Sequence, residues 1–285
     1  MRLLILIVAW TLNRGFHLSL SSRMDDLFGR GFRAIPGSVL ARSLGIPAVT
    51  GLLIVMLVAG VAVLQFRLST LFAGAPAAAL EFMVLTLVVG CDRLRLGMDA
   101  YQQDERQKRW PASRPLLLQA GFAVRKTWIS TEVRQLDLVG QSLALSFQRY
   151  FLIIFWFMLA GAAGALLARL ALSVVRQPNA AQLNVGQLLL PLLEWIPLRL
   201  FALTAVVCGQ GALVSRMTDD RIPLMLANRD ELFQGLVRSL AAQARQSGGE
   251  SFANTLMLSS RSLLTQCLLI WIGLLAVAYA SSYLV

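Results

Sequence analysis

The fold class is decided by residues 188–209, which read Leu-Leu-Leu-Pro-Leu-Leu-Glu-Trp-Ile-Pro-Leu-Arg-Leu-Phe-Ala-Leu-Thr-Ala-Val-Val-Cys-Gly. Roughly 20 apolar residues in a helix cross a bilayer core of about 30 Å, and this stretch has that length. It nevertheless contains Glu194 and Arg199, with Pro191 and Pro197 close by. Because an ionisable group near the bilayer centre costs at least ~2.5–3.5 kcal/mol, a span that keeps two of them needs a reason to do so.

The composition also indicates a membrane protein. The chain has 285 residues, of which 57% are hydrophobic and 14% charged, and its mean hydropathy is +0.66. These values are typical of a polytopic helical membrane protein. The net charge of +11 suits basic cytoplasmic loops beside anionic lipid headgroups, so the predicted partner is the lipid bilayer and not nucleic acid.

Apolar runs predict an all-α fold with five or six transmembrane helices in a single domain over residues 1–285. The short apolar run 2–12 is the uncertain one, and the others are residues 46–64, 71–90, 150–168, 188–209 and 263–284. An amphipathic helix that ends near residue 147 is expected to lie on the membrane before the chain enters it. Gly161 and Ala165 are spaced for close packing against another helix.

Lysine and arginine counts predict the orientation. Successive loops contain 5, 1, 10, 2 and 6 basic residues, and the tail contains none. By the positive-inside rule, loops 13–45, 91–149 and 210–262 are cytoplasmic and the C-terminus is periplasmic.

The charges inside the opening span have two readings. Glu194 and Arg199 lie about 140° apart around a regular helix, but Pro197 kinks the helix and leaves the Leu193 carbonyl in need of another partner. A broken helix could line a polar pocket in which Arg199 meets an anionic ligand. Alternatively, the charges make a structural contact to a neighbouring helix, because buried pairs often only determine packing.

The sequence contains no motif typical of a metal site, a catalytic site or a phosphate-binding loop. The cysteines are isolated, His17 is the single histidine, and the acids are scattered, so the sequence predicts no metal site and no catalytic residue. Lys126-Thr127 lacks the glycines of a phosphate-binding loop. No cofactor is identified.

Two stretches carry a family resemblance. The first, Arg149-Tyr-Phe-Leu-Ile-Ile-Phe-Trp-Phe-Met-Leu-Ala-Gly-Ala-Ala-Gly-Ala-Leu-Leu-Ala-Arg169-Leu, resembles the Arg-x-Phe…Phe-Trp-Phe…Gly-x-x-Gly-Ala…Arg-Leu pattern of the AmpE proteins. The second, Leu193-Glu-Trp-Ile-Pro-Leu-Arg-Leu-Phe-Ala-Leu, is similar to their Leu-(Asp/Glu)-Trp-Ile-Pro-x-Arg-Leu segment.

The resemblance implies a bacterial inner-membrane protein linked to the AmpD amidase of peptidoglycan recycling and to signalling for β-lactamase induction. It also places the chain in a superfamily with the CobD/CbiB enzymes of cobalamin biosynthesis. Those enzymes have a Glu-Asn…Asp pattern where this chain has Ala144, Leu145 and Gln148. The expected function is therefore regulation through a bound ligand or partner, and a membrane-bound adenosylcobinamide-phosphate synthase-like enzyme is the alternative.

A transporter or channel subunit is a third possibility, but the sequence shows no inverted repeat. The candidate ligand-binding residues, where helices 150–168 and 188–209 are expected to meet, are Arg149, Arg169, Glu194, Trp195 and Arg199.

Overall fold

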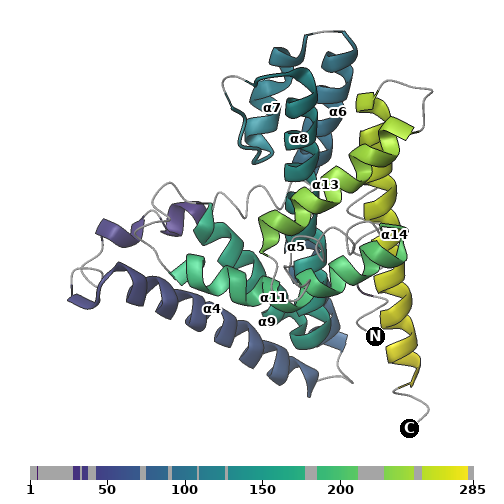
Figure 1. Cartoon of the computed structure of the whole chain (residues 1–285). Helices are drawn as coiled ribbons and strands as arrows, with labels where there is room; N and C mark the ends of the chain where they lie inside the picture. The colour runs from purple at the N-terminus through teal and green to yellow at the C-terminus, as the bar shows by residue number, and fades with distance from the viewer. Residues whose placement is uncertain are drawn as a thin grey trace. The chain divides into compact units, whose positions relative to one another are not determined.

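The chain folds into helices throughout the part that the structure describes. The computed structural model describes residue 5 and residues 28–32, 34–37, 43–70, 75–88, 92–107, 109–125, 128–176, 185–210, 228–246 and 252–281. Every regular element in these ranges is helical (Figure 1), which confirms the predicted all-α class. The elements are η1 (Ile35–Gly37), α4 (Ile46–Ser69), α5 (Ala75–Val88), α6 (Asp92–Arg106), η3 (Trp110–Ser113), α7 (Arg114–Gln119), α8 (Thr131–Ser146), η4 (Phe147–Phe151), α9 (Leu152–Val175), α11 (Val185–Val207), α13 (Arg229–Gln246) and α14 (Phe252–Ser281).

Two compact units are interleaved along the sequence. The first consists of Met1–Gly90 with Gln148–Pro197, and the second of Cys91–Phe147 with Leu198–Val285. One boundary between the units falls inside α11, so each unit is built from discontinuous segments. The single domain expected over residues 1–285 stays a prediction.

In the first unit, α4 and α5 pack against α9. The core joins Phe32 and Ile35 to Ile54 of α4 and to Leu170 and Val174 of α9. The rest of α4 is apolar on all sides and largely uncovered, with Met56 66% and Phe66 70% exposed. A helix that is hydrophobic around its whole circumference is stable in lipid, which agrees with the predicted span.

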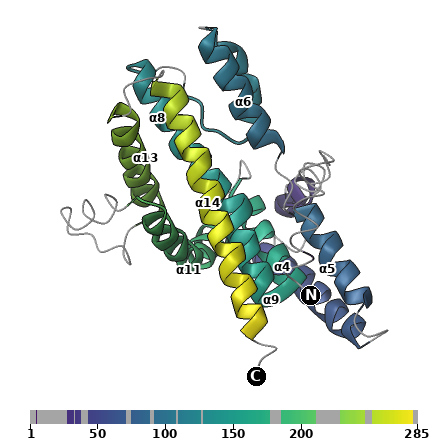
Figure 2. The ribbon, with the colours of Figure 1, turned by 90° about the vertical axis from the view of Figure 1, so that its right-hand side faces the viewer.

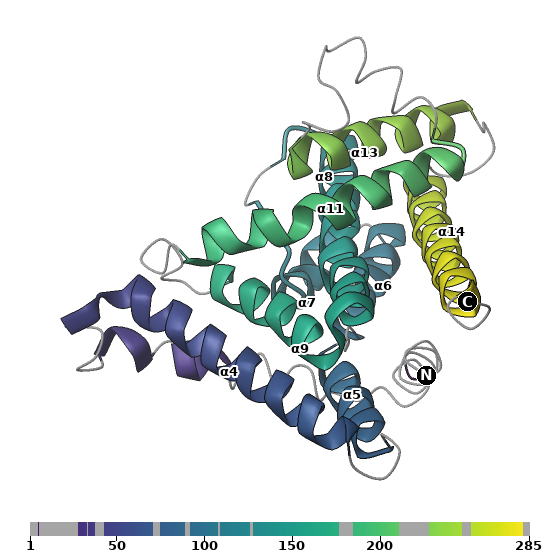
Figure 3. The ribbon, with the colours of Figure 1, turned by 90° about the horizontal axis from the view of Figure 1, so that it is seen from below.

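Helix α9 changes direction along its length (Figure 3), and Gly161 is the residue inside it whose backbone angles are not helical. Gly161 has φ +65° and ψ −147°, a backbone conformation that is essentially restricted to glycine. The predicted span at 150–168 lies within a helix long and apolar enough to cross a membrane, and the structure adds that one residue in its middle interrupts the helical backbone. Gly161 permits the break as well as the close packing predicted for it.

Four helices in the described ranges are long and apolar enough to cross a membrane. They are Ile46–Ser69, Thr131–Val175, Val185–Val207 and Phe252–Leu274, at the positions of four predicted spans. The 14 described residues of α5 form a shorter apolar helix, and the ends of the predicted span 71–90 lie outside the described residues. The uncertain span 2–12 also lies outside them except for Ile5.

In the second unit, α8 packs against α6, α13 and α14, and Figure 2 shows α13 and α14 beside α8. Ser130 caps α8, because its hydroxyl accepts a hydrogen bond from the Val133 amide at 3.2 Å. The apolar face of α8 is fully buried at Leu138, Val139 and Leu143. The helix was expected to lie on the membrane, but in the structure this face packs against protein, because α13 is amphipathic as well and covers it.

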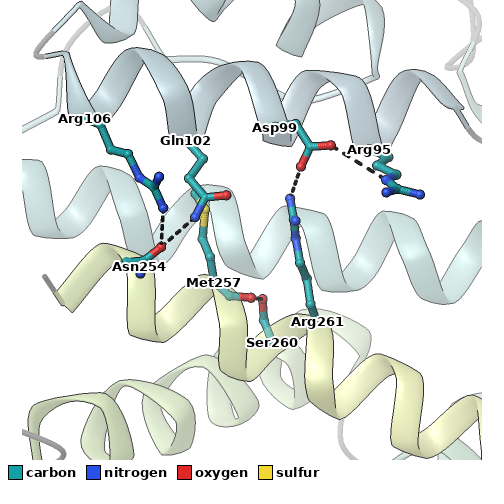
Figure 4. A network of polar contacts seen from close by, with 8 residues as sticks. All are labelled: Arg95, Asp99, Gln102, Arg106, Asn254, Met257, Ser260 and Arg261. Atoms are coloured by element: carbon teal, nitrogen blue, oxygen red, sulfur yellow. Dashed lines mark hydrogen bonds and ion pairs between the residues drawn. The ribbon is translucent and has the colours of Figure 1, made fainter. Parts of the chain in front are cut away.

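Helix α14 begins at Phe252, well before the span predicted from residue 263. Its first turns are polar, so a hydropathy pattern does not include them. These turns are bonded to α6 through side chains, because Asn254 accepts hydrogen bonds from Gln102 at 2.7 Å and from Arg106 at 3.0 Å (Figure 4). Arg261 of α14 also pairs with Asp99 of α6.

Candidate functional site

The candidate site begins at the π-helical turn Phe147–Phe151, between α8 and α9. A π-helical turn inserts an extra residue per turn and is frequent at functional sites. It carries Gln148 and Arg149, whose side chains are 8% and 7% exposed. The sequence therefore places two long polar side chains inside the first unit, directly before the apolar Phe-Trp-Phe segment of α9.

Gln148 is the partner of Glu194. The side-chain amide Nε2 of Gln148 donates a hydrogen bond to Oε1 of Glu194 at 2.8 Å, and Glu194 is only 4% exposed. Because a buried polar group without a partner is costly, this bond stabilises Glu194 within an apolar helix. The sequence identifies Gln148 as a replacement for an acidic residue, but it does not predict that Gln148 contacts Glu194.

Trp156 supplies the partner that Pro197 makes necessary. Proline has no backbone N–H, so the Leu193 carbonyl loses its helical donor. The indole Nε1 of Trp156 donates to that carbonyl at 3.1 Å. The prediction that the Leu193 carbonyl needs another partner is thereby confirmed, and the Phe-Trp-Phe and Glu-Trp-Ile-Pro segments are joined by a specific contact.

Helix α11 continues through both prolines. Pro191 and Pro197 lie inside the single α-helix Val185–Val207, so the helix is not broken into separate helices there. The kink expected at these prolines stays a prediction. The glycine at position 161, and not a proline, is where a helix of the first unit loses its regular backbone.

The other predicted site residues differ in burial and in unit. Arg169 lies on the second half of α9 and is 2% exposed, whereas Trp195 is 54% exposed. Arg199 is 9% exposed and belongs to the second unit, while the remaining four belong to the first. Of the five predicted residues, Glu194 is the one that the hydrogen bond to Gln148 involves. A common ligand-binding role for all five stays a prediction.

A second polar pair lies beside the break in α9. Gln65 of α4 donates from Nε2 to Oε1 of Glu81 of α5 at 2.6 Å, and Glu81 is 7% exposed. A methyl group on Gly161 would overlap Gln65 Nε2 and lie 2.9 Å from Glu81 Oε1. The sequence marks Glu81 as an acid within a span. Nothing in the spacing along the chain indicates Gln65 or Gly161 as its neighbours.

The polar contacts of the second unit hold helices together. Arg134 of α8 donates from Nη2 to both carboxylate oxygens of Glu105 at 2.8 Å, and its Nε reaches the Tyr101 hydroxyl at 3.4 Å. Burial raises the pKa of Tyr101 to about 12. The Asp99–Arg261 contact in Figure 4 joins side chains that are about half exposed, and pairs of this kind contribute at most about 1 kcal/mol.

Within the described ranges, no group of three or more His, Cys, Asp or Glu side chains lies close enough together to hold a metal ion. The carboxylate of Glu194 faces an amide, and the carboxylate of Glu81 faces another. These arrangements hold carboxylates in place between helices and are suited to recognition.

Together, the long apolar helices and the buried polar contacts between them define a helical membrane protein with polar groups enclosed among its spans. The family described as regulatory signalling modulator protein AmpE matches residues 1–219. The chain therefore belongs to the AmpE family, and the family description assigns it a regulatory signalling role. Neither the curated proteins nor the solved structures give a significant match.

Proposed function

We propose that this chain is a multi-pass protein of the bacterial inner membrane that modulates signalling for β-lactamase induction in the response to β-lactam antibiotics. It acts by binding a ligand or a partner, and its role is linked to peptidoglycan recycling through the AmpD amidase. Membership of the AmpE family supports the regulatory part of this proposal. The long apolar helices support the membrane location.

The observation that carries binding in preference to catalysis is the Gln148–Glu194 pair. Glu194 is buried and accepts a hydrogen bond from the neutral amide of Gln148. Gln148 stands where the CobD/CbiB pattern has an aspartate. General acid–base or carboxylate chemistry uses convergent acids in a pocket, and an amide cannot exchange protons in this way. An amide–carboxylate pair instead presents a defined set of donors and acceptors, which suits recognition.

The ligand expected at this site is anionic. Arg149 and Arg169 bring two buried guanidinium groups into the first unit, and Arg199 adds a third buried one in the second. Arginine is the residue best suited to bidentate recognition of carboxylate or phosphate groups. The proposed site therefore combines Glu194 and Gln148 with Arg149 and Arg169, all in the first unit, and Arg199 follows Glu194 along the same helix.

The test compares Glu194→Gln with Leu188→Ala in a host that lacks its own AmpE protein. Glutamine at 194 still accepts a hydrogen bond from Gln148, so we expect normal folding, but it has no charge with which to position a guanidinium group for an anionic ligand. Loss of about 1.4 kcal/mol of interaction weakens ligand binding about tenfold, and induced β-lactamase activity should fall as a result. Leu188 is 77% exposed, so its alanine variant is the matched control and should induce normally.

Two results contradict this proposal. The first is full induction by a well-folded Glu194→Gln chain, because the charge of Glu194 would then have no role. The second concerns Arg199: normal folding of Arg199→Ala with unchanged induction removes that residue from the proposed site.

The alternative function is a membrane-bound cobalamin-biosynthesis enzyme of the adenosylcobinamide-phosphate synthase kind. Expression of the chain in a cobalamin-pathway mutant distinguishes the two functions. The regulatory proposal predicts no growth on cobalamin-dependent medium, and rescue of growth establishes the enzyme instead.

A further inference from the structure

Two cysteines that are far apart in the sequence meet in the second unit. Cys208 follows the last residue of α11, and Cys267 lies in α14, 59 residues later. Their Sγ atoms are 3.9 Å apart, within sulfur hydrogen-bonding distance. The sequence presents its cysteines as isolated, because the spacing along the chain matches no known framework, and the fold overturns that interpretation for these two.

The two thiols differ in exposure. Cys208 is partly exposed, at the point where the chain leaves α11 through Gly209 with φ +92°, whereas Cys267 is fully buried. Cys208 is therefore the more accessible of the two thiols, and the Cys267 thiol lies 3.9 Å from it. An accessible thiol beside a second thiol that can resolve it is the arrangement found at many redox-sensing cysteine pairs.

We propose that Cys208 and Cys267 form a redox-sensitive thiol pair that is oxidised reversibly to a disulfide by exchange with a small-molecule disulfide. The Cys208 thiolate attacks one sulfur of that disulfide, forms a mixed disulfide and releases the first small thiol. The Cys267 thiol then loses its proton and attacks Cys208 Sγ, which forms the internal disulfide and releases the second small thiol. The small disulfide gains two electrons, and the two cysteines lose them.

The distance to be closed is small. A disulfide requires the two sulfur atoms to approach from 3.9 Å to about 2.0 Å. The predicted topology places Cys208 at the cytoplasmic end of its span. In that reducing compartment a disulfide is typically transient and redox-sensing, and seldom a permanent structural bond.

Oxidation would constrain a specific part of the molecule. Gln210, two residues after Cys208, donates a hydrogen bond to Gln243 at 3.2 Å and accepts one from Ser239 at 2.8 Å, so the end of α11 is already joined to α13. A Cys208–Cys267 disulfide would join the same end covalently to α14. Helix α11 also carries Glu194, so the pair offers a way for redox state to act on the helix of the candidate site.

The experiment treats the full chain in detergent micelles with oxidised glutathione, then alkylates the remaining thiols under denaturing conditions and maps the peptides by mass spectrometry. The expected result is loss of two alkylatable thiols, a linked pair of peptides that contain Cys208 and Cys267, and an alkylated Cys91. Dithiothreitol should restore the two oxidised thiols, so that all three cysteines are alkylated. Because mapping uses the unaltered chain, the result does not depend on the folding of a variant.

Single variants provide the controls. Cys91→Ser should form the same link, whereas Cys267→Ser should stop at a glutathione adduct on Cys208. A wild-type chain that keeps a stable glutathione adduct on Cys208, keeps both thiols free, or links either cysteine to Cys91 overturns the proposal.

Discussion

At the scale of single residues, the contact between Trp156 and the Leu193 carbonyl explains how a proline is accommodated inside a membrane helix. Lipid offers no hydrogen bonds, so a carbonyl without its helical donor must find another donor in the protein. The indole of Trp156 supplies it at 3.1 Å from a neighbouring helix. Gln148 serves the same purpose for the Glu194 carboxylate at 2.8 Å.

A double-mutant cycle tests this explanation. Trp156→Phe keeps an aromatic ring but removes the N–H, so it should lower the free energy of unfolding by about 1–2 kcal/mol. In a Pro197→Ala background, the amide of residue 197 can donate to the Leu193 carbonyl again, and the cost of Trp156→Phe should shrink to a few tenths of a kcal/mol. Unfolding in mixed micelles measures both costs, and equal costs in the two backgrounds contradict the proposed exchange of donors.

At the scale of secondary-structure elements, the break in α9 is the feature that most changes the fold from a simple bundle. Gly161 adopts a conformation reserved for glycine, and the Gln65–Glu81 pair fills the space where a side chain would stand. The break and the polar pair therefore depend on one another. Helices α4 and α5 contribute the polar side chains Gln65 and Glu81, and α9 has only the hydrogen of Gly161 at the position that they approach.

Gly161→Ala is expected to be strongly destabilising. The new methyl group meets Gln65 and Glu81, and φ +65° strains any residue other than glycine, so the loss should be about 2–5 kcal/mol. Gly60→Ala in α4 is the matched control, because no atom lies within 4 Å of its added carbon, and it should be neutral or slightly stabilising. Thermal unfolding of the two variants measures the difference, and similar melting temperatures contradict this account.

At the scale of the whole molecule, the distribution of basic residues predicts how the chain is oriented in the membrane. The three long loops contain 5, 10 and 6 lysines and arginines, and the connecting turns and the tail contain two or fewer. Because basic loops are retained on the cytoplasmic side, the chain should cross the membrane in one predictable orientation.

Reporter fusions test the orientation directly. Alkaline phosphatase fused after Val285 should be active, since the C-terminus is predicted to be periplasmic, and phosphatase fused after Gln119 should be inactive. A green fluorescent reporter at the same two positions should give the opposite pattern. A fluorescent fusion at Val285 contradicts the predicted orientation, whatever the ligand of the site.

The sequence by itself determined the features that depend on composition along the chain. Length and apolarity identify an all-helical membrane protein, because each span needs only enough consecutive apolar residues to cross lipid. The two motif stretches that begin at Arg149 and Leu193 resemble the AmpE family, and the family match confirms that resemblance. The sequence also identified the need for a second donor at the Leu193 carbonyl, since that need arises from Pro197 within one helix. These are local or additive properties.

Only the tertiary structure decided which distant residues satisfy one another. The Gln148–Glu194 bond, the Gln65–Glu81 pair at Gly161 and the Cys208–Cys267 contact each join different elements. It also decided that α8 buries its apolar face against protein and that α14 begins before its apolar part. Such partners are chosen by how helices pack in three dimensions, and neither hydropathy nor spacing along one chain contains that information.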